Sequence, residues 1–345
     1  MSYELSILDK CPVNEGETSQ QALFNTVELA RTAEQWGYKR FWIAEHHNTS
    51  TLASPAPEIM IAWVLAHTQK IKVGSGGVML QHYSPYKVAE NFNLLASLAP
   101  GRVELGIGKA PGGFPLSTRA LQAGKDPASQ GTFSEQLTLL DQYLHPTPSA
   151  DPAERLLATP LPVHAAQPYL LGASRDSAQL AATLGWQFVF AAHLNGDKNI
   201  LSQFIHFWKQ YSQQPVIVAL QVIVSEDAQQ AKKQAQTLQL WQVTLQNGQH
   251  VTVGSEAQAE TFSRQSDVPV VAVARKPTTV LAGSPSQVLS ALDDLHQQFA
   301  IDEFMLDIPV TDPQDRREIL RLLASEKQKT ISACNAQQRA GVPVT

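Results

Sequence analysis

Cysteines and long apolar runs are scarce in this chain of 345 residues. The only two cysteines, Cys11 and Cys334, lie near opposite ends and form no CxxC pair, which argues against a disulfide framework and a cysteine-based zinc site. No run of about 18 apolar residues occurs, so no membrane-spanning helix is expected. Residues 1–9 also lack the basic start and the long apolar segment of a secretory signal. These absences together predict a protein of the reducing cytoplasm.

Charge is also low in this chain. Charged residues make up 17% of the sequence, and the net charge is -5. Lysines and arginines form no cluster, so nucleic acid is not an expected partner. Hydrophobic residues reach 43%, which is enough for a large core. The length suits either one large α/β barrel or two smaller domains.

Short apolar stretches alternate with stretches of helical spacing along most of the chain. In residues 19–36, for example, Leu23, Val27 and Ala30 recur at helical spacing, and Gly37 follows as a stop signal. This alternation predicts parallel strands joined by helices. Eight strands are expected, at residues 5–8, 40–44, 72–80, 103–107, 169–172, 188–191, 216–224 and 303–307.

Eight strand–helix units predict an α/β fold, a (β/α)8 TIM barrel with insertions, and we expect a single domain over residues 1–345. An open doubly wound sheet is the alternative, but no GxGxxG turn follows the first strand. Residues 112–128 are expected to form a loop, residues 227–246 a long helix, and residues 248–281 an insertion without clear periodicity. Catalytic groups of such barrels lie at the carboxyl ends of the strands, which selects the candidates that follow.

Small residues interrupt the third strand and follow the fourth. The third strand contains a run of four small residues that ends in Gly76-Gly77. Glycine inside a strand usually marks a bulge or the close approach of another group. Lys109 follows the fourth strand beside a glycine, where it could hold a phosphate or simply lie in a solvated loop.

The second strand runs into Glu45-His46-His47. Two histidines and a carboxylate at this place could bind a metal or move protons. Adjacent residues of a strand point to opposite faces, so the two histidines cannot easily bind one ion, and no metal site is expected. We expect one histidine to face the pocket and the other to support the loop. The alternative is that both only form hydrogen bonds at the barrel rim.

The fifth strand leads directly into a helix that begins around Ser174, Arg175 and Ser177. The N-terminus of a helix offers free N–H groups and a positive dipole end, which together can hold a phosphate. The two hydroxyl groups would add donors, and the arginine would add a full charge. Simple capping of the helix by Ser174 explains the same residues without any ligand.

Together these segments resemble the bacterial luciferase-like monooxygenase family, in its single-chain flavin-dependent branch rather than its light-emitting enzymes. The matching segments follow one another in the same order as in the family over residues 3–193, and a weaker match follows nearer the end of the chain. The matching segments are Ala44-Glu45-His46-His47, residues 73–80, Ser84-Pro85 with Ala89-Glu90, Pro100-Gly101-Arg102, residues 105–108, residues 171–174 with Ser177-Ala178-Gln179 and, more weakly, residues 282–285 and 302–306.

The resemblance implies a (β/α)8 barrel that uses reduced FMN and reacts with O2 at the flavin. It implies that His46 faces the flavin and assists proton movement. It also implies that Gly76-Gly77 forms a non-proline cis peptide under the flavin ring, where two glycines would leave room for the ring. Gly108 stands where light-emitting relatives carry a reactive cysteine, so light emission is not expected.

The resemblance also indicates how the FMN phosphate would be held. Ser174 and Ser177 match phosphate-binding hydroxyls, with Arg175 beside them. Lys109 replaces the usual arginine, and this keeps the charge but loses the two-pronged hydrogen bonding of a guanidinium.

We therefore expect a monooxygenase that oxidises a small organic substrate with O2 and reduced FMN. NAD(P)H or a separate flavin reductase would supply the electrons. A homodimer is also expected, because relatives often pair through their second and third helices, and Ile59, Ile61, Trp63 and Val64 could form that face or belong to the core. Two alternatives stay open. The chain could be a deazaflavin-dependent hydride-transfer enzyme on the same fold, or a non-catalytic flavin-binding protein.

Overall fold

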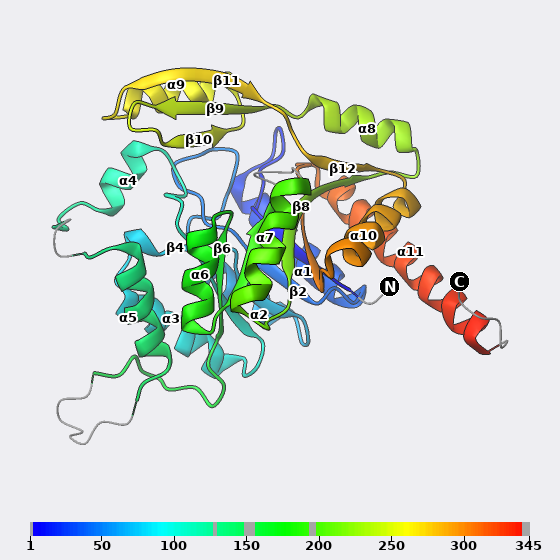
Figure 1. Ribbon diagram of the computed structural model, residues 1–345, viewed down its shortest axis with the longest axis horizontal. Coiled ribbons are helices and arrows are strands. Elements are labelled where there is room, and N and C mark those ends of the chain that lie inside the picture. Colours follow the sequence, from blue (N-terminus) through cyan, green and yellow to red (C-terminus); the bar gives the residue numbers. More distant parts are fainter. Residues whose placement is uncertain (1–2, 127–129, 148–155, 193–197, 340–345) are drawn as a thin grey trace.

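The computed structural model describes residues 3–126, 130–147, 156–192 and 198–339 (Figure 1). Within this part, eight parallel strands close into a barrel, because the last strand pairs with the first and the remaining neighbours pair in turn. The barrel confirms the (β/α)8 prediction, with a strand at each expected place, and the open sheet is wrong. In order around the barrel the strands are β1 (Glu4–Asp9), β2 (Arg40–Ile43), β3 (Lys72–Ser75), β5 (Val103–Gly108), β6 (Gln167–Gly172), β7 (Gln187–Ala191), β8 (Ile217–Val224) and β13 (Glu303–Asp307).

Helices cover the outside of this barrel. Several begin at a capping box, in which a Thr or Ser side chain and a Gln or Glu three residues later satisfy each other's backbone N–H groups; Thr18, Thr132 and Ser284 are such caps. The surrounding helices are α1 (Ser19–Gln35), α2 (Pro57–His67), α3 (Pro85–Leu98), α5 (Phe133–Leu144), α6 (Arg175–Leu184), α7 (Lys198–Tyr211), α10 (Pro285–Phe299) and α11 (Pro313–Arg339).

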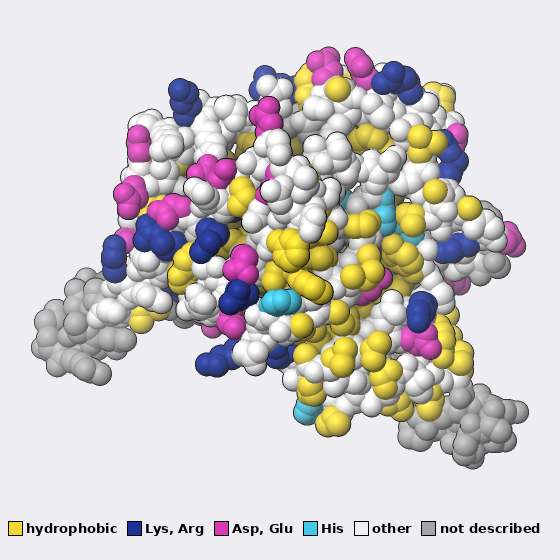
Figure 2. Space-filling model, turned by 180° about the vertical axis from the view of Figure 1, so that it is seen from behind, with side chains coloured by type: hydrophobic (Ala, Val, Ile, Leu, Met, Phe, Trp, Pro, Cys, Tyr) yellow, Lys and Arg dark blue, Asp and Glu magenta, His cyan; other side chains and the backbone are white. Residues whose placement is uncertain are grey.

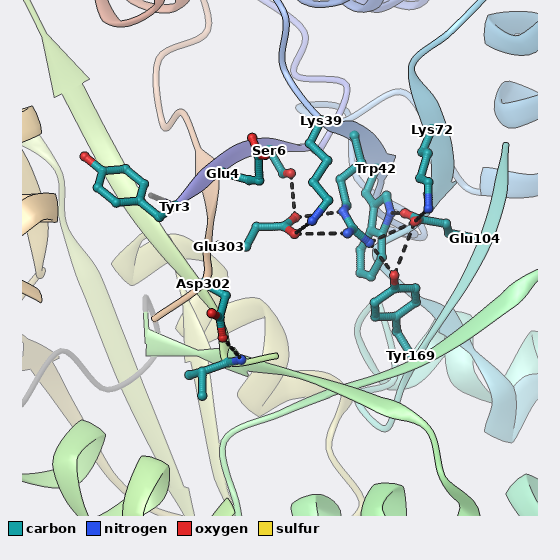
Figure 3. Close-up of polar contacts among 12 residues, drawn as sticks. Tyr3, Glu4, Ser6, Lys39, Trp42, Lys72, Glu104, Tyr169, Asp302 and Glu303 are labelled. Carbon is teal, nitrogen blue, oxygen red and sulfur yellow. Dashed lines mark hydrogen bonds and ion pairs between the residues drawn. The ribbon is translucent and has the colours of Figure 1, made fainter. Parts of the chain in front are cut away.

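The interior of the barrel is filled, so ligands cannot pass through it. An apolar cluster that includes Leu8, Trp42 and Met305 occupies the middle. The amino end of the barrel holds a buried ionic cluster, in which Arg40 contacts Glu104 at 2.9 Å and Glu303 at 2.7 Å (Figure 3). Because this end is closed by packed polar groups, only the carboxyl end of the strands is left for a ligand, as in other barrels of this kind.

A separate small sheet lies between β8 and β13 in the sequence. Its antiparallel strands are β9 (Leu240–Leu245), β10 (His250–Val253) and β11 (Val270–Lys276), and α9 (Glu256–Gln265) packs against them. The sequence segment also contains α8 (Ala228–Thr237) and β12 (Val280–Gly283), and β12 pairs with β8. The predicted helix over residues 227–246 is therefore wrong beyond Thr237. There, Val243 and Leu245 alternate with less buried residues, and the pattern of one buried face fits a strand.

The expected loop 112–128 contains a further short helix in its described part, α4 (Pro115–Leu121). It packs against the small sheet, since Phe114 and Phe262 make an edge-on ring contact at 5.8 Å and Arg119 pairs with Asp267 at 3.0 Å. Both α4 and the small sheet follow the carboxyl ends of barrel strands, and Figure 1 shows them on the same side of the molecule. Cys11 is buried and free, whereas the side chain of Cys334 lies outside the described residues.

Candidate active site

His46 lies at the carboxyl end of β2. Trp42 and Ala44 belong to the apolar cluster inside the barrel, and His46 is the next residue in this alternation. Its Nδ1 atom is buried and has no hydrogen-bond partner among the described residues. Burial lowers the pKa of His46 to about 4, with a further contribution from the charge of Lys10, while Asp307 opposes the shift. The imidazole is therefore neutral at pH 7.

A polar arc continues from His46 over the neighbouring strands. Lys10 follows β1 and its Nζ lies 2.5 Å from Asp307 Oδ2 at the end of β13. Gln221 of β8 donates from Nε2 to the same oxygen at 2.8 Å. Because β8, β13, β1 and β2 are consecutive around the barrel, these four side chains line one half of its mouth. Sequence reasoning missed Lys10, Gln221 and Asp307. The available signal was weak, a polar residue at or just after the carboxyl end of an apolar strand.

The opposite half of the mouth includes the glycine-rich segment. The peptide bond between Gly76 and Gly77 is cis, and it joins β3 to β4 (Val78–Met79), which pairs with β5. A Cβ atom on Gly76 would lie 2.3 Å from Leu8 Cδ1, and one on Gly77 would lie 2.8 Å from the carbonyl oxygen of Gly106. Backbone atoms thus already require glycine at position 77, whereas at position 76 the clash is with the end of the Leu8 side chain, which would have to move. Room for a flavin ring is not needed to explain Gly77, and contact of either glycine with a cofactor stays a prediction.

Glu45 and His47 form a second polar group beside the mouth. The fully buried Glu45 carboxylate accepts hydrogen bonds from Tyr83 Oη at 2.8 Å and from the backbone N of Met79 at 3.1 Å, and its Oε1 lies 2.7 Å from His47 Nε2. The backbone N of His47 also donates to the carbonyl oxygen of Gly112 at 2.8 Å. These contacts tie the end of β2 to β4 and to the loop after β5. The two histidines therefore lie in different surroundings, with His47 bound into the loop and His46 Nδ1 without a partner among the described residues.

The predicted phosphate residues lie after β5 and β6, which are adjacent strands. Ser174 is the N-cap of α6: its Oγ accepts from the backbone N of Ser177 at 3.2 Å and lies 2.9 Å from Ser177 Oγ. Arg175 is exposed and donates to Gln203 Oε1 at 3.3 Å. Lys109 is also exposed, and its Nζ lies 5.9 Å from the ring centroid of Phe133. The two serines are thus in direct contact, whereas Arg175 contacts α7 and Lys109 contacts α5.

A sequence profile described as luciferase-like monooxygenase matches residues 4–302. The chain belongs to the luciferase-like monooxygenase family. N-acetyl-S-alkylcysteine monooxygenase of Bacillus subtilis (strain 168) is 39% identical to it over 327 residues, which span 93% of this chain and 97% of that protein. The resemblance drawn from the motifs is therefore confirmed, and the chain is a monooxygenase by family.

Solved structures share the fold of this chain. The crystal structure of apo-MsnO8 is similar with a TM-score of 0.74 and 30% identity, and the match covers 94% of this chain and 98% of that one. An F420-dependent secondary alcohol dehydrogenase in complex with an F420–acetone adduct has a TM-score of 0.63 at 14% identity, covering 93% of this chain and 98% of that one. At this identity the second likeness shows the shared fold alone.

Two further observations describe this luciferase-like monooxygenase. In the described part of the chain, no three or more His, Cys, Asp and Glu side chains gather in a way that could hold a metal ion. Nor does any described helix combine the length and apolar character needed to cross a membrane.

Proposed function

We propose that this chain uses reduced FMN and O2 to oxidise a small organic substrate at the carboxyl end of its barrel. The observation that carries the proposal is the buried Nδ1 atom of His46, which lacks a partner among the described residues. A buried nitrogen of this kind costs free energy unless a ligand or a water molecule completes its hydrogen bond. It lies at the one end of the barrel that the ionic cluster leaves open.

The chemical types of the residues at the mouth suit a flavin. Reduced FMN would supply two electrons to O2, so that one oxygen atom enters the substrate and the other leaves as water. His46, neutral at pH 7, would offer Nδ1 to a ligand as a hydrogen-bond donor or acceptor, according to its tautomer. The loop after β5, with α4, and the small sheet would limit the access of water to this place.

The phosphate would be held at the amino end of α6. This helix has ten residues, and its first N–H groups and dipole favour an anion. Ser174 and Ser177 would add hydroxyl donors, and Arg175 and Lys109 positive charge. Asp176 places a carboxylate in the same first turn, and this works against an anion there. The positive charges of Arg175 and Lys109 are therefore needed to offset this carboxylate. Without them, Ser174 would be expected only to cap the helix.

Fluorescence titration with FMN tests this assignment. We expect Ser174→Ala combined with Lys109→Ala to weaken FMN binding about 30-fold or more, because a hydroxyl donor and a charge are both removed. Riboflavin, which lacks the phosphate, should bind the wild type and this double variant equally. Ser284→Ala with Lys329→Ala is the matched control, since Ser284 caps α10 and Lys329 is exposed on α11. Equal FMN affinity of the wild type and the Ser174/Lys109 variant would disprove the phosphate site.

The substrate class is suggested by the relative with 39% identity, and we propose N-acetyl-S-alkylcysteines as the first compounds to test. Electrons would come from NAD(P)H or from a separate flavin reductase. Turnover with NAD(P)H and FMN alone, compared with turnover after adding a reductase, separates these sources. A deazaflavin-dependent hydride transfer is the competing function, and it predicts reduction of the deazaflavin by an alcohol without accelerated O2 uptake. Flavin binding without turnover of any candidate substrate would instead favour a protein that only binds flavin.

We also propose that the chain forms a homodimer through α2 and α3. Apolar side chains gather on the face shown in Figure 2. On α2, Ile59 and Trp63 are 68% and 50% exposed, and on α3 Leu98 is 70% exposed. Ile61 and Val64, the other two residues considered for this face, are fully buried and belong to the core. An apolar surface on two adjacent helices is typical of a contact between subunits.

A further inference from the structure

The polar arc at the barrel mouth carries an accessible charge that the flavin assignment does not use. Lys10 and Asp307 form an ion pair of 2.5 Å, but their side chains differ in exposure, 30% for Lys10 and 2% for Asp307. The carboxylate is thus enclosed by the protein, and Gln221 also donates to its Oδ2. A ligand that enters the mouth would meet the ammonium group rather than the carboxylate.

The contacts of Lys10 leave room for a second acceptor. An ammonium group has three N–H donors, and Asp307 Oδ2 takes one of them. His46, the next residue of the arc, is neutral at pH 7 and neither attracts nor repels an anion strongly. The accessible group on this side of the mouth is therefore a cation, which favours a ligand with a negative charge.

This cation lies far from the proposed phosphate site. Lys10 follows β1, whereas Ser174 follows β6. In the closed barrel β1 and β6 are separated by three strands in either direction, β2, β3 and β5 on one side and β13, β8 and β7 on the other. The two sites therefore lie across the mouth from each other, and a phosphate bound at α6 leaves Lys10 available.

We propose that Lys10 binds a carboxylate group of the substrate, so that this chain acts on carboxylate-bearing molecules. The inference rests on the proposed function, in which FMN is held from the side of β6. Lys10 determines specificity, with Asp307 and Gln221 holding its ammonium group in place. The carboxylate at β1 would direct the rest of the substrate toward the centre of the mouth, where His46 lies.

Calorimetric binding of acid and ester pairs tests this without turnover. The probes are N-acetyl-S-methylcysteine, N-acetylmethionine and hexanoate, each beside its uncharged methyl ester, added to protein with oxidised FMN. For at least one pair we expect the wild type to prefer the acid by about 20-fold or more, as a charge-assisted hydrogen bond would give. Lys10→Gln can still donate to Asp307 but carries no charge, and it should reduce this preference to about threefold or less. Lys10→Arg should keep most of it.

Lys39→Gln is the matched control. Lys39 also pairs with a buried carboxylate, Glu303 at 2.9 Å, and its side chain is 37% exposed, but it lies at the closed end of the barrel. Its variant should keep the wild-type preference for acids.

Several results would overturn the proposal. These are a wild type that binds no acid better than its ester, and a Lys10→Gln variant that keeps the preference. If Lys10→Gln does not fold, the comparison of acid with ester in the wild type and in Lys10→Arg still tests the proposal. FMN affinity is measured in parallel. Loss of FMN binding in Lys10→Gln, with the acid preference intact, would place Lys10 at the flavin and refute the substrate role, whereas failure of FMN to bind the wild type would refute only the proposed cofactor.

Discussion

Replacing His46 by Gln should make the free energy of unfolding less sensitive to acid. Burial lowers the pKa of this histidine from 6.5 to about 4 in the folded protein. As the pH falls below 6.5, the unfolded chain binds a proton at this position and the folded protein does not, so the folded state is destabilised. The loss accumulates between pH 6.5 and 4 and is constant below that range. At pH 4.5 it amounts to about 2.5 kcal/mol, and above pH 7 it is absent.

The assay is urea denaturation of the wild type and His46→Gln at pH 7.5 and pH 4.5. Other groups titrate in this range as well, but they are common to both proteins, so the difference between the two losses isolates His46. We expect the wild type to lose about 2.5 kcal/mol more than the variant. His145→Gln is a suitable control, because its side chain is 51% exposed and its Nδ1 lies 3.0 Å from Asp141 in the last turn of α5. Equal losses in wild type and His46→Gln would show that His46 is not held neutral, and the role assigned to Nδ1 would fail.

Two other predictions follow from the described contacts. Arg40→Met should lower the free energy of unfolding by about 3–5 kcal/mol, because Glu104 and Glu303 would lose the buried cation that they share. The part-exposed Lys72 and Lys39 would then remain beside these two carboxylates. Arg31→Met, which breaks an exposed pair with Glu28, should cost less than about 1 kcal/mol, and equal effects in chemical denaturation would contradict this. Ile59→Glu with Leu98→Glu should convert the proposed dimer to a monomer in light scattering, whereas Val271→Glu, at a 59% exposed residue of β11, should not. A wild type that is already monomeric would disprove the dimer.

The barrel strands could be predicted from sequence because their signal is local. Each is a short apolar stretch between helical patterns, and the stretches at residues 5–8 and 303–307 stand out as clearly as those in between. The helix predicted over 227–246 shows the limit of this reasoning. Its first half has the Ala, Gln and Lys content of a helix, and the second half becomes a strand because Val243 and Leu245 pack beneath α9 in the small sheet. That packing depends on partners more distant in the sequence.

The residues of the candidate site also fall into those that local sequence motifs reveal and those that only the fold brings together. His46 and Ser174 lie in local motifs and could be singled out from the sequence. Lys10 and Asp307 are about 300 residues apart, and only the closure of the barrel, which pairs β1 with β13, brings them together. The reason first given for Gly76-Gly77 was also incomplete, because the atoms that would meet a side chain there belong to the protein itself.

The account rests on the proposal that an organic substrate is oxidised by O2 at this mouth, with reduced FMN as the source of electrons. The most direct test is mass spectrometry of the product after the protein reacts with reduced FMN, N-acetyl-S-methylcysteine and labelled oxygen gas, 18O2. We expect one labelled oxygen atom in the product, with O2 consumed faster than by free flavin, and much less product from His46→Gln. An unlabelled or absent product over a panel of carboxylate-bearing thioethers, together with reduction of a deazaflavin by an alcohol, would contradict the account.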